Sequence, residues 1–198
     1  TGYYSLPGKF PVFHVECMTY RKSPIYHATV VGPPPMEDYF IGLGIEHLMF
    51  PLLQMQLPEV IDLHFPKEGV FHNLCLVSIR KRYPGHARKI MHALWGMGQA
   101  MFTKVIVVFD EDVDIRDTSG ALWKALNNID PERDIEIVRG PLDILDHASP
   151  QIGYGSKIGI DATKKWKEEG HGRDWPDEIK MNADVVKKID SIWENLEL

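Results

Sequence analysis

Five consecutive apolar residues, VIVVF at 105–109, are the feature that most restricts what this chain can fold into. Side chains along a strand point alternately to opposite faces, so a strand that is apolar at every position needs cover on both faces. The stretch therefore predicts a central strand in a sheet with helices on both sides. Further strand-like runs lie at 60–65, 71–81 and 134–140.

Amphipathic helices are predicted between these strands. Residues 86–101 place apolar side chains three and four positions apart, which gives one apolar face. A second helix is expected to run to about Leu126, with Thr118 or Ser119 as its cap. Alternating strands and helices are typical of sheets with right-handed parallel crossovers. We therefore predict an α/β fold with a mixed, largely parallel sheet and flanking helices.

The amino-terminal residues have a different pattern. The runs at 10–20 and 25–32 are rich in β-branched and aromatic residues, and RKSP between them can form a turn. We predict a β-hairpin here. Because an isolated hairpin is marginal in water, it is expected to pair with strands upstream of Thr1, so that the chain begins inside a larger domain.

Loops and terminal elements complete the predicted order. Three prolines in GPPPMED exclude a helix interior and lead into a long helix at 37–56, with a kink or break expected at Pro51. Residues 143–175 are rich in Gly, Lys and Pro and predict a long loop, which in a compact domain is usually functional or disordered. An amphipathic helix at 183–197 closes the chain and is suited to packing on a neighbouring subunit.

Composition excludes several classes of function. The formal net charge of -6 leaves no general basic surface, so no nucleic-acid partner is expected. No apolar run approaches the roughly 20 residues of a membrane span, so no integral membrane segment is predicted. Cys17 and Cys75 lack metal-ligand spacing and are predicted to be buried free thiols. Such thiols fit a cytoplasmic protein, with association at a membrane surface left open.

An acidic stretch follows the central strand and comprises Asp110, Glu111, Asp112, Asp114 and Asp117. One interpretation is a Mg²⁺-dependent phosphatase of the haloacid-dehalogenase kind, in which Asp110 attacks the phosphoryl group and Asp112 protonates the leaving group. The remaining parts of that chemistry are missing downstream. The favoured interpretation is a loop whose carboxylates face solvent, cap the next helix or pair with Arg116, and at most line an interface.

Motifs for metals and nucleotides are also missing. The nine histidines form no HxH, HExxH or HxxxH pattern, so no metal site is predicted within the chain. Neither GxGxxG nor GxxxxGK[ST] occurs, so no phosphate cradle is predicted.

Six stretches taken together resemble the UbiD family of decarboxylases, in the family's order and over essentially the whole chain. They are TGYYSLPGKFPVF, HATVVGPPPMED, FPKEG, YPGHARK, VIVVFDEDVDIRD and ASPQIGYGSKIGIDATKKW. The resemblance implies the carboxyl-terminal portion of such an enzyme. It implies that 1–32 is the tail of the flavin-binding split β-barrel, that 33–140 is the carboxyl-terminal α/β domain, and that 141–198 is a loop and terminal helix with an oligomer contact.

The implied activity is non-oxidative decarboxylation of aromatic or α,β-unsaturated carboxylic acids, such as a polyprenyl-4-hydroxybenzoate on the route to ubiquinone. The implied cofactors are prenylated FMN, which acts as the electron sink, with Mn²⁺ or Mg²⁺ and K⁺. An acid must return a proton to the carbon that loses CO₂. The family's Glu-Arg-Glu/Asp catalytic set and its metal ligands fall upstream of Thr1. No catalytic residue is therefore expected in this chain.

By the same resemblance, the chain supplies one wall of the substrate pocket. Pro34, Glu37 and Ile41 match the stretch that faces the flavin, and Pro150 and Lys157 match a loop that closes over the site. These five are the predicted substrate-binding residues. The implied assembly is a homo-oligomer, either a dimer or a hexamer. A non-catalytic assembly fragment and the phosphatase described above are the alternatives.

Overall fold

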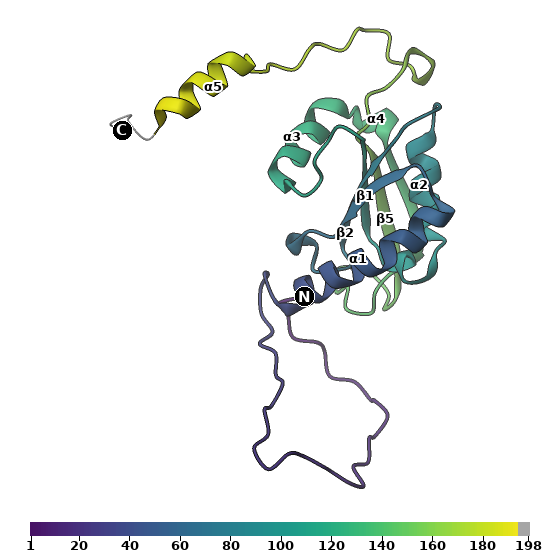
Figure 1. Ribbon diagram of the computed structural model, residues 1–198. Helices are drawn as coiled ribbons and strands as arrows, with labels where there is room; N and C mark the ends of the chain where they lie inside the picture. Colours follow the sequence, from purple (N-terminus) through teal and green to yellow (C-terminus); the bar gives the residue numbers. More distant parts are fainter. Residues whose placement is uncertain (194–198) are drawn as a thin grey trace.

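The centre of the molecule is a five-stranded sheet with the strand order β1-β2-β3-β5-β4 (Figure 1). The computed structural model describes residues 1–193. Strands β2 (Leu74–Ile79), β3 (Val105–Asp110) and β5 (Tyr154–Asp161) run parallel to one another. Strands β1 (Val60–His64) and β4 (Ile135–Pro141) form the antiparallel edges. The predicted mixed sheet is confirmed.

Helices cover both faces of the sheet, as predicted. Helices α1 (Glu37–Gln56) and α2 (His86–Trp95) pack with one face, and α3 (Thr118–Asn128) packs with the other. The shorter or peripheral elements are α4 (Pro131–Asp134), α5 (Ala183–Ile192) and the 3₁₀ turns η1 (Lys67–Gly69), η2 (Gly98–Phe102) and η3 (Lys167–Glu169).

The alternating side chains of β3 join the two apolar cores. Ile106 and Val108 pack in the core that contains α2, whereas Val107 and Phe109 pack in the core that contains α3. All four are buried. The prediction of a central strand with both faces covered is therefore confirmed, and it explains why no polar residue interrupts the run.

Strand β5 lies where the sequence predicted only loop, and that prediction is wrong for residues 154–161. The glycines that suggested a loop are packing residues. A Cβ atom on Gly159 would lie 2.5 Å from the Met91 sulfur and 3.0 Å from the Trp95 ring, so only glycine lets α2 approach this closely. The sheet thus continues past residue 140, where the α/β domain was expected to end.

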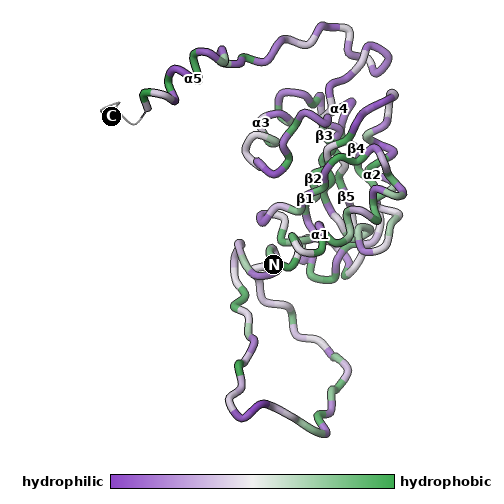
Figure 2. Tube along the Cα trace, viewed as in Figure 1, coloured by the Kyte–Doolittle hydropathy of each residue, from purple (hydrophilic) through white to green (hydrophobic). Residues whose placement is uncertain are grey.

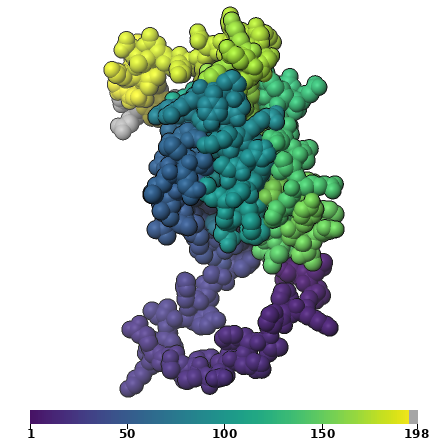
Figure 3. Space-filling model, turned by 90° about the vertical axis from the view of Figure 1, so that its right-hand side faces the viewer, coloured from purple at the N-terminus to yellow at the C-terminus, as the bar shows by residue number. Residues whose placement is uncertain are grey.

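Residues 1–36 contain no strand and form an open, mostly exposed segment that projects from the sheet (Figures 1 and 3). The predicted hairpin does not form in this chain by itself, and its pairing with further strands of a larger domain stays a prediction. Its apolar side chains, including Phe13 and Tyr26, are exposed. Figure 2 shows green, hydrophobic stretches along this segment. A two-stranded ribbon without further strands or a packing layer is marginal in water, which gives the physical reason. Cys17 is exposed here, contrary to prediction, whereas Cys75 is buried.

Helix boundaries differ from expectation in small ways. Helix α1 is continuous through Pro51 rather than broken into two. Helix α3 begins at Thr118 with Asp117 at the N-cap position, so the predicted cap was one or two residues late. Helix α5 confirms the start of the terminal helix, and the expected continuation to 197 lies outside the described residues.

Within residues 1–193, no helix has both the length and the apolar character needed to cross a membrane.

Candidate functional site

Four of the five predicted substrate residues lie at the edge of the sheet where the parallel strands begin. The segment that enters α1 carries Pro34, Glu37 and Ile41, and the loop between β4 and β5 carries Pro150 (Figure 1). The first residues of the chain link these two segments. Gly2 lies against Pro33, where an added Cβ would be 3.2 Å from the Pro33 Cα, and the rings of Tyr3 and His147 lie 4.4 Å apart between centroids.

Carboxylates of both segments also act on His72. His72 immediately precedes β2, and its pKa responds to carboxylates of both segments, Asp38 and Asp143. Burial nevertheless dominates and lowers the pKa of His72 below its ordinary value. The edge thus combines residues that are more than 100 positions apart in the sequence.

Accessibility differs sharply among the five predicted residues. Pro34 and Pro150 are exposed, Ile41 is 56% exposed, and Glu37 is partly buried. Lys157 is instead only 3% exposed. It lies within β5, and its ammonium group donates a hydrogen bond to the Met101 carbonyl. The structure therefore brings four of the predicted residues to one edge and does not bring Lys157 there.

Burial also changes the chemistry of Lys157. Its ammonium nitrogen lies 5.9 Å from the centre of the Trp95 ring, beneath α2 and η2. Burial lowers the pKa of Lys157 because the charged form loses hydration. The prediction that Lys157 contacts substrate depended on a loop, and the segment is a strand.

An apolar groove of about 620 Å³, missed by the sequence reasoning, lies on the α1 side of the same region. It is bounded by α1, the turn at 65–72 and η2. Most of its lining is apolar, and its ionisable members are Glu46, His72 and Asp143. The sequence of α1 could have indicated this groove. Its apolar residues occur on every side of the helix, a pattern typical of helices that are covered all round.

Glu46 fixes α1 to the sheet. Its carboxylate, with the side chain only 2% exposed, accepts hydrogen bonds from the Phe65 backbone N–H at 2.6 Å and from His64 Nδ1 at 3.3 Å. The Arg116 guanidinium approaches the same carboxylate at 3.5 Å and makes two shorter hydrogen bonds to Asp62, at 2.8 and 2.9 Å. These bonds to Asp62 raise the pKa of Arg116. The Arg116 guanidinium therefore pairs with Asp62 and Glu46, and both of these lie outside the acidic loop that follows β3.

The acidic loop after β3 is held by backbone and side-chain contacts. Asp110 accepts a hydrogen bond from the Lys164 backbone N–H at 2.6 Å, and burial raises the pKa of its carboxyl group. Glu111 pairs with Arg80 at 2.8 Å, and Asp112 is exposed. Among residues 1–193 no group of three or more His, Cys, Asp or Glu side chains could hold a metal ion. Through the bond from Lys164 to Asp110, this loop holds the segment that follows β5.

Buried lysines complete that anchor. Lys165 donates hydrogen bonds to the Asp161 and Thr163 carbonyls, each at 2.7 Å, and its ammonium lies 2.9 Å from the Asp161 carboxylate. Lys81 donates to Thr163 Oγ1 at 3.1 Å and pairs with Glu169. Both ammonium groups are saturated by protein partners, so they stabilise this end of the sheet rather than offer an anion site.

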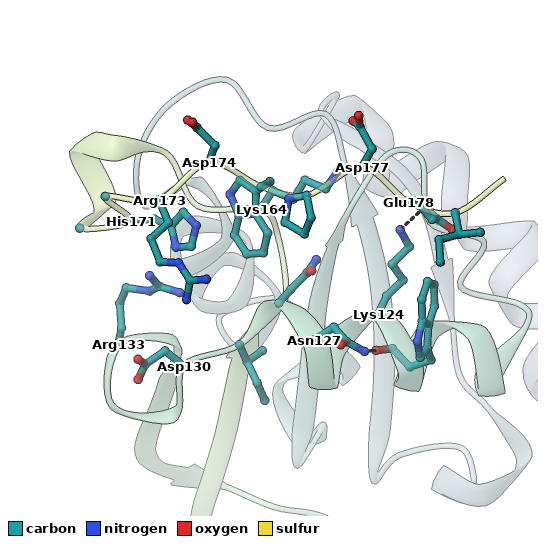
Figure 4. Close-up of a pocket in the computed structure, with 18 residues that line it drawn as sticks. Lys124, Asn127, Asp130, Arg133, Lys164, His171, Arg173, Asp174, Asp177 and Glu178 are labelled. Carbon is teal, nitrogen blue, oxygen red and sulfur yellow. Dashed lines mark hydrogen bonds and ion pairs between the residues drawn. The ribbon is translucent and has the colours of Figure 1, made fainter.

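A second cavity, of about 710 Å³, lies between α3, α4 and the segment 170–179 (Figure 4). Acidic and basic side chains alternate around it. Several of them are paired: Arg133 forks onto Asp134 with two bonds of 2.8 Å, and Lys124 pairs with Glu178 at 2.6 Å. The lining of this cavity therefore has mixed charge, and neither sign dominates it.

Two family models match the chain in consecutive blocks. The model for the 3-octaprenyl-4-hydroxybenzoate carboxy-lyase Rift-related domain matches residues 1–34. The model for the carboxyl-terminal domain of the same enzymes matches residues 38–162, which is more than half of the chain.

Curated relatives match almost the full chain. A protein of Aquifex aeolicus, described as uncharacterized, is 50% identical over 196 residues, which is 99% of this chain and 40% of that protein. A protein of Archaeoglobus fulgidus, described in the same way, is 48% identical over 197 residues, covering 99% and 41%. The chain thus spans about two fifths of the length of these relatives.

Solved structures share the fold. The closed form of Sedimentibacter hydroxybenzoicus vanillic acid decarboxylase superimposes with a TM-score of 0.76 at 24% identity, over 91% of this chain and 38% of that one. The UbiD-class enzyme HmfF from Pelotomaculum thermopropionicum, in complex with FMN, gives a TM-score of 0.65 at 24% identity, over 78% and 34%. On the strength of the two family models, the chain belongs to the UbiD family and corresponds to its carboxyl-terminal portion.

Proposed function

We propose that the protein containing this chain decarboxylates aromatic or α,β-unsaturated carboxylic acids on prenylated FMN, and that this chain forms one wall of the substrate pocket. The observation that carries the proposal is the match of both family models in consecutive order. Two proteins with similar folds support an aromatic substrate, since one is a vanillic acid decarboxylase and another, from Enterobacter cloacae, a 3,4-dihydroxybenzoic acid decarboxylase. A hydroxybenzoate, with or without a polyprenyl chain, is the substrate class we favour.

The modified flavin would supply the electron sink for the pair left when CO₂ departs. We propose that the catalytic acids, the arginine and the ligands for Mn²⁺ or Mg²⁺ and K⁺ lie upstream of Thr1. The donor set within residues 1–193 does not fit a divalent cation by itself, because no group of three or more suitable side chains gathers there. We derive no catalytic step through the flavin or the metal from these residues.

The role of this chain in the pocket follows from its exposed edge. Pro34, Ile41 and Pro150 offer apolar surface that would pack against an aromatic ring and exclude water from the reacting carbon. Glu37, in the first turn of α1, carries a carboxylate that suits the helix amino terminus and can accept a hydrogen bond from a ring hydroxyl. Orientation and exclusion of water are the contributions we assign to this wall.

The test uses the full-length protein with bound flavin and a panel of hydroxybenzoates and cinnamates, with release of CO₂ as the readout. Ile41→Trp adds bulk at the proposed wall without burying it in the sheet domain, and we expect kcat/KM to fall about tenfold or more. Leu48→Trp is the matched control, since Leu48 is on the same helix and 73% exposed. Equal effects of the two variants would contradict the placement of the wall. A flavin-loaded protein that releases CO₂ from no acid of the panel would contradict the activity.

We further propose a cytoplasmic homo-oligomer, a dimer or a hexamer, in which α5 contributes an intersubunit contact. Its apolar side chains support this, because they are exposed and gather on one face of the helix; they are Val185, Val186, Ile189, Ile192 and Trp193. One similar solved structure is an evolved dimeric form of the UbiD-class enzyme HmfF.

A further inference from the structure

The cavity between α3, α4 and the segment 170–179 lies where α/β sheets usually bind their ligands. Strand β5 ends at Asp161, and Lys164, shortly after it, lines the cavity. Ligands of open α/β sheets bind beyond the carboxyl ends of the parallel strands, and this is that edge. Residues 1–36 project from the opposite end of the sheet (Figure 1), so the cavity is separate from the proposed substrate wall. Its volume of about 710 Å³ falls within the roughly 300–1,000 Å³ typical of small-molecule pockets.

Basic and acidic side chains both line the cavity, but they are not equally available to a ligand. Among the acids, the Glu178 carboxylate pairs with Lys124 at 2.6 Å. Asp174 and Asp177 are exposed, and Figure 4 shows both carboxylates pointing away from the cavity. Asp130 caps the amino terminus of α4 with its side chain. Little free negative charge therefore faces the interior of the cavity.

The basic side chains, in contrast, keep donors free. Arg133 binds Asp134 through Nε and Nη2, which leaves Nη1 for another partner. The Arg173 guanidinium and the Lys164 ammonium form no hydrogen bond or ion pair with the other lining residues drawn in Figure 4. In the same view the Arg173 side chain extends toward Arg133. Two guanidinium groups turned toward one another favour an anion between them, and only one of the two already has a carboxylate partner.

Aromatic rings form a flat part of the wall. The Trp175 indole N–H donates to the Lys165 carbonyl at 2.9 Å, and the ring stacks on His171 with 4.3 Å between centroids. These two contacts fix the indole in place. Trp123 lines the cavity from α3; the Lys124 ammonium lies 5.1 Å from its ring centre, and Trp123 remains 51% exposed. Such rings offer apolar surface to planar groups, so the cavity combines free cationic donors with a surface for stacking.

We propose that this cavity binds an organic phosphate monoester with a planar aromatic body. Guanidinium groups bind phosphate oxygens in a bidentate manner. A phosphate monoester carries a charge of about −1.5 to −2 at pH 7, so it can satisfy more cations than a carboxylate can. An inorganic anion alone would leave the aromatic wall without a contact. The site is independent of the proposed decarboxylation, whose substrates are carboxylates and whose wall lies at the other end of the sheet.

The experiment titrates the full-length protein, as purified and without added flavin, by isothermal titration calorimetry. AMP has both parts of the proposed ligand, whereas adenosine lacks the phosphate and inorganic phosphate lacks the ring. We expect AMP to bind at least tenfold more tightly than either of the other two probes. Flavin released during the titration is measured in a filtrate by its absorbance, because AMP that acts at a flavin site would displace flavin.

A first pair of variants tests the cationic end of the cavity. Arg173→Gln removes a guanidinium and should weaken AMP binding at least tenfold. Arg173 is exposed, so the substitution leaves the fold intact, which an unchanged Tm would show. Arg139→Gln is the matched control, because Arg139 is exposed on β4 and does not line the cavity.

A second pair of variants tests the aromatic wall. Trp123→Ala should weaken AMP binding at least fivefold, because stacking of the base is lost. Leu122→Ala changes the adjacent residue, which is 58% exposed and does not line the cavity, and should leave AMP binding unchanged.

Several results would overturn the inference. They are the absence of AMP binding, equal affinities for AMP and adenosine, equal affinities for AMP and inorganic phosphate, or equal losses in a variant and its matched control. Displacement of flavin by AMP would do the same, since it would place AMP at the flavin site. None of these outcomes alters the CO₂-release assay of the proposed function.

Discussion

At the scale of single residues, Glu59 shows how partners can outweigh burial. Burial alone would raise the pKa of its carboxyl group, but hydrogen bonds from Lys89 and His86 dominate together and lower that pKa to about 2. The His86 bond is 3.1 Å long and buried. Since His86 and Lys89 are on α2 and Glu59 precedes β1, these contacts fasten the helix to the edge of the sheet.

The lowered pKa predicts a defined pH dependence of stability. A carboxyl group with a folded-state pKa near 2 and an ordinary value of 4.5 stabilises the fold above pH 4.5, and that stabilisation is lost as the pH falls toward 2. We expect Glu59→Gln to reduce the free energy of unfolding by about 1–2 kcal/mol at pH 7 and by less at pH 3, measured by urea denaturation. Glu68→Gln, in an exposed pair with Lys67, should change it by less than about 0.5 kcal/mol. A deficit of the same size at pH 7 and pH 3 would contradict this origin.

Residue positions at the candidate site were predictable only in part. The resemblance nominated Pro34, Glu37, Ile41 and Pro150, and the fold brings all four to one edge. Lys157 was predicted to lie in a loop but is buried within β5, where its ammonium group bonds to a carbonyl of η2, and no local sequence pattern reveals that contact. His72 was missed because no motif marks it; its Nε2 is buried without a hydrogen-bond partner within residues 1–193.

At the scale of elements, α1 contains two glycines with opposite surroundings. Gly42 is buried against Phe71, whereas a Cβ on Gly44 would meet nothing within 4 Å. Gly44→Ala should raise the free energy of unfolding by up to about 1 kcal/mol, because alanine favours the helix. Gly42→Ala should lower it by about 1–3 kcal/mol, because the Phe71 ring must move. Thermal unfolding of the two variants, side by side, checks the docking of α1. A gain in both would show that α1 does not pack on the turn as described.

Element types were predictable where one periodicity dominated the sequence. The apolar run of β3 and the one-sided pattern of α2 were sufficient to predict the element and its cover. Strand β5 was not recognised, because Gly155 and Gly159 lower strand propensity at positions that tertiary packing requires to be small. Residues 10–32 show the opposite case, since their high strand propensity meets no partner strand within residues 1–193 and they stay extended.

At the scale of the whole molecule, unpartnered apolar surface indicates further contacts. If α5 packs across a subunit boundary, Ile189→Glu should weaken self-association of the full-length protein about tenfold or more, because it would bury an unpaired charge. Lys187→Glu introduces the same group on the opposite face of the helix and should have little effect. Sedimentation velocity over a range of concentrations measures both. An unchanged oligomer in Ile189→Glu would exclude α5 from the interface.

The position of β5 between β3 and β4 has a consequence for the order of folding. Strand β4 precedes β5 in the sequence, yet it hydrogen-bonds within the sheet only to β5. Until β5 arrives, β4 has no strand to pair with, so the sheet cannot grow outward one strand at a time. The two must come together as a hairpin whose later arm then pairs with β3, about 50 residues earlier in the chain. We therefore expect the closure of β5 onto β3 to be the slow event in forming this sheet, because it is the strand pairing that spans the most sequence.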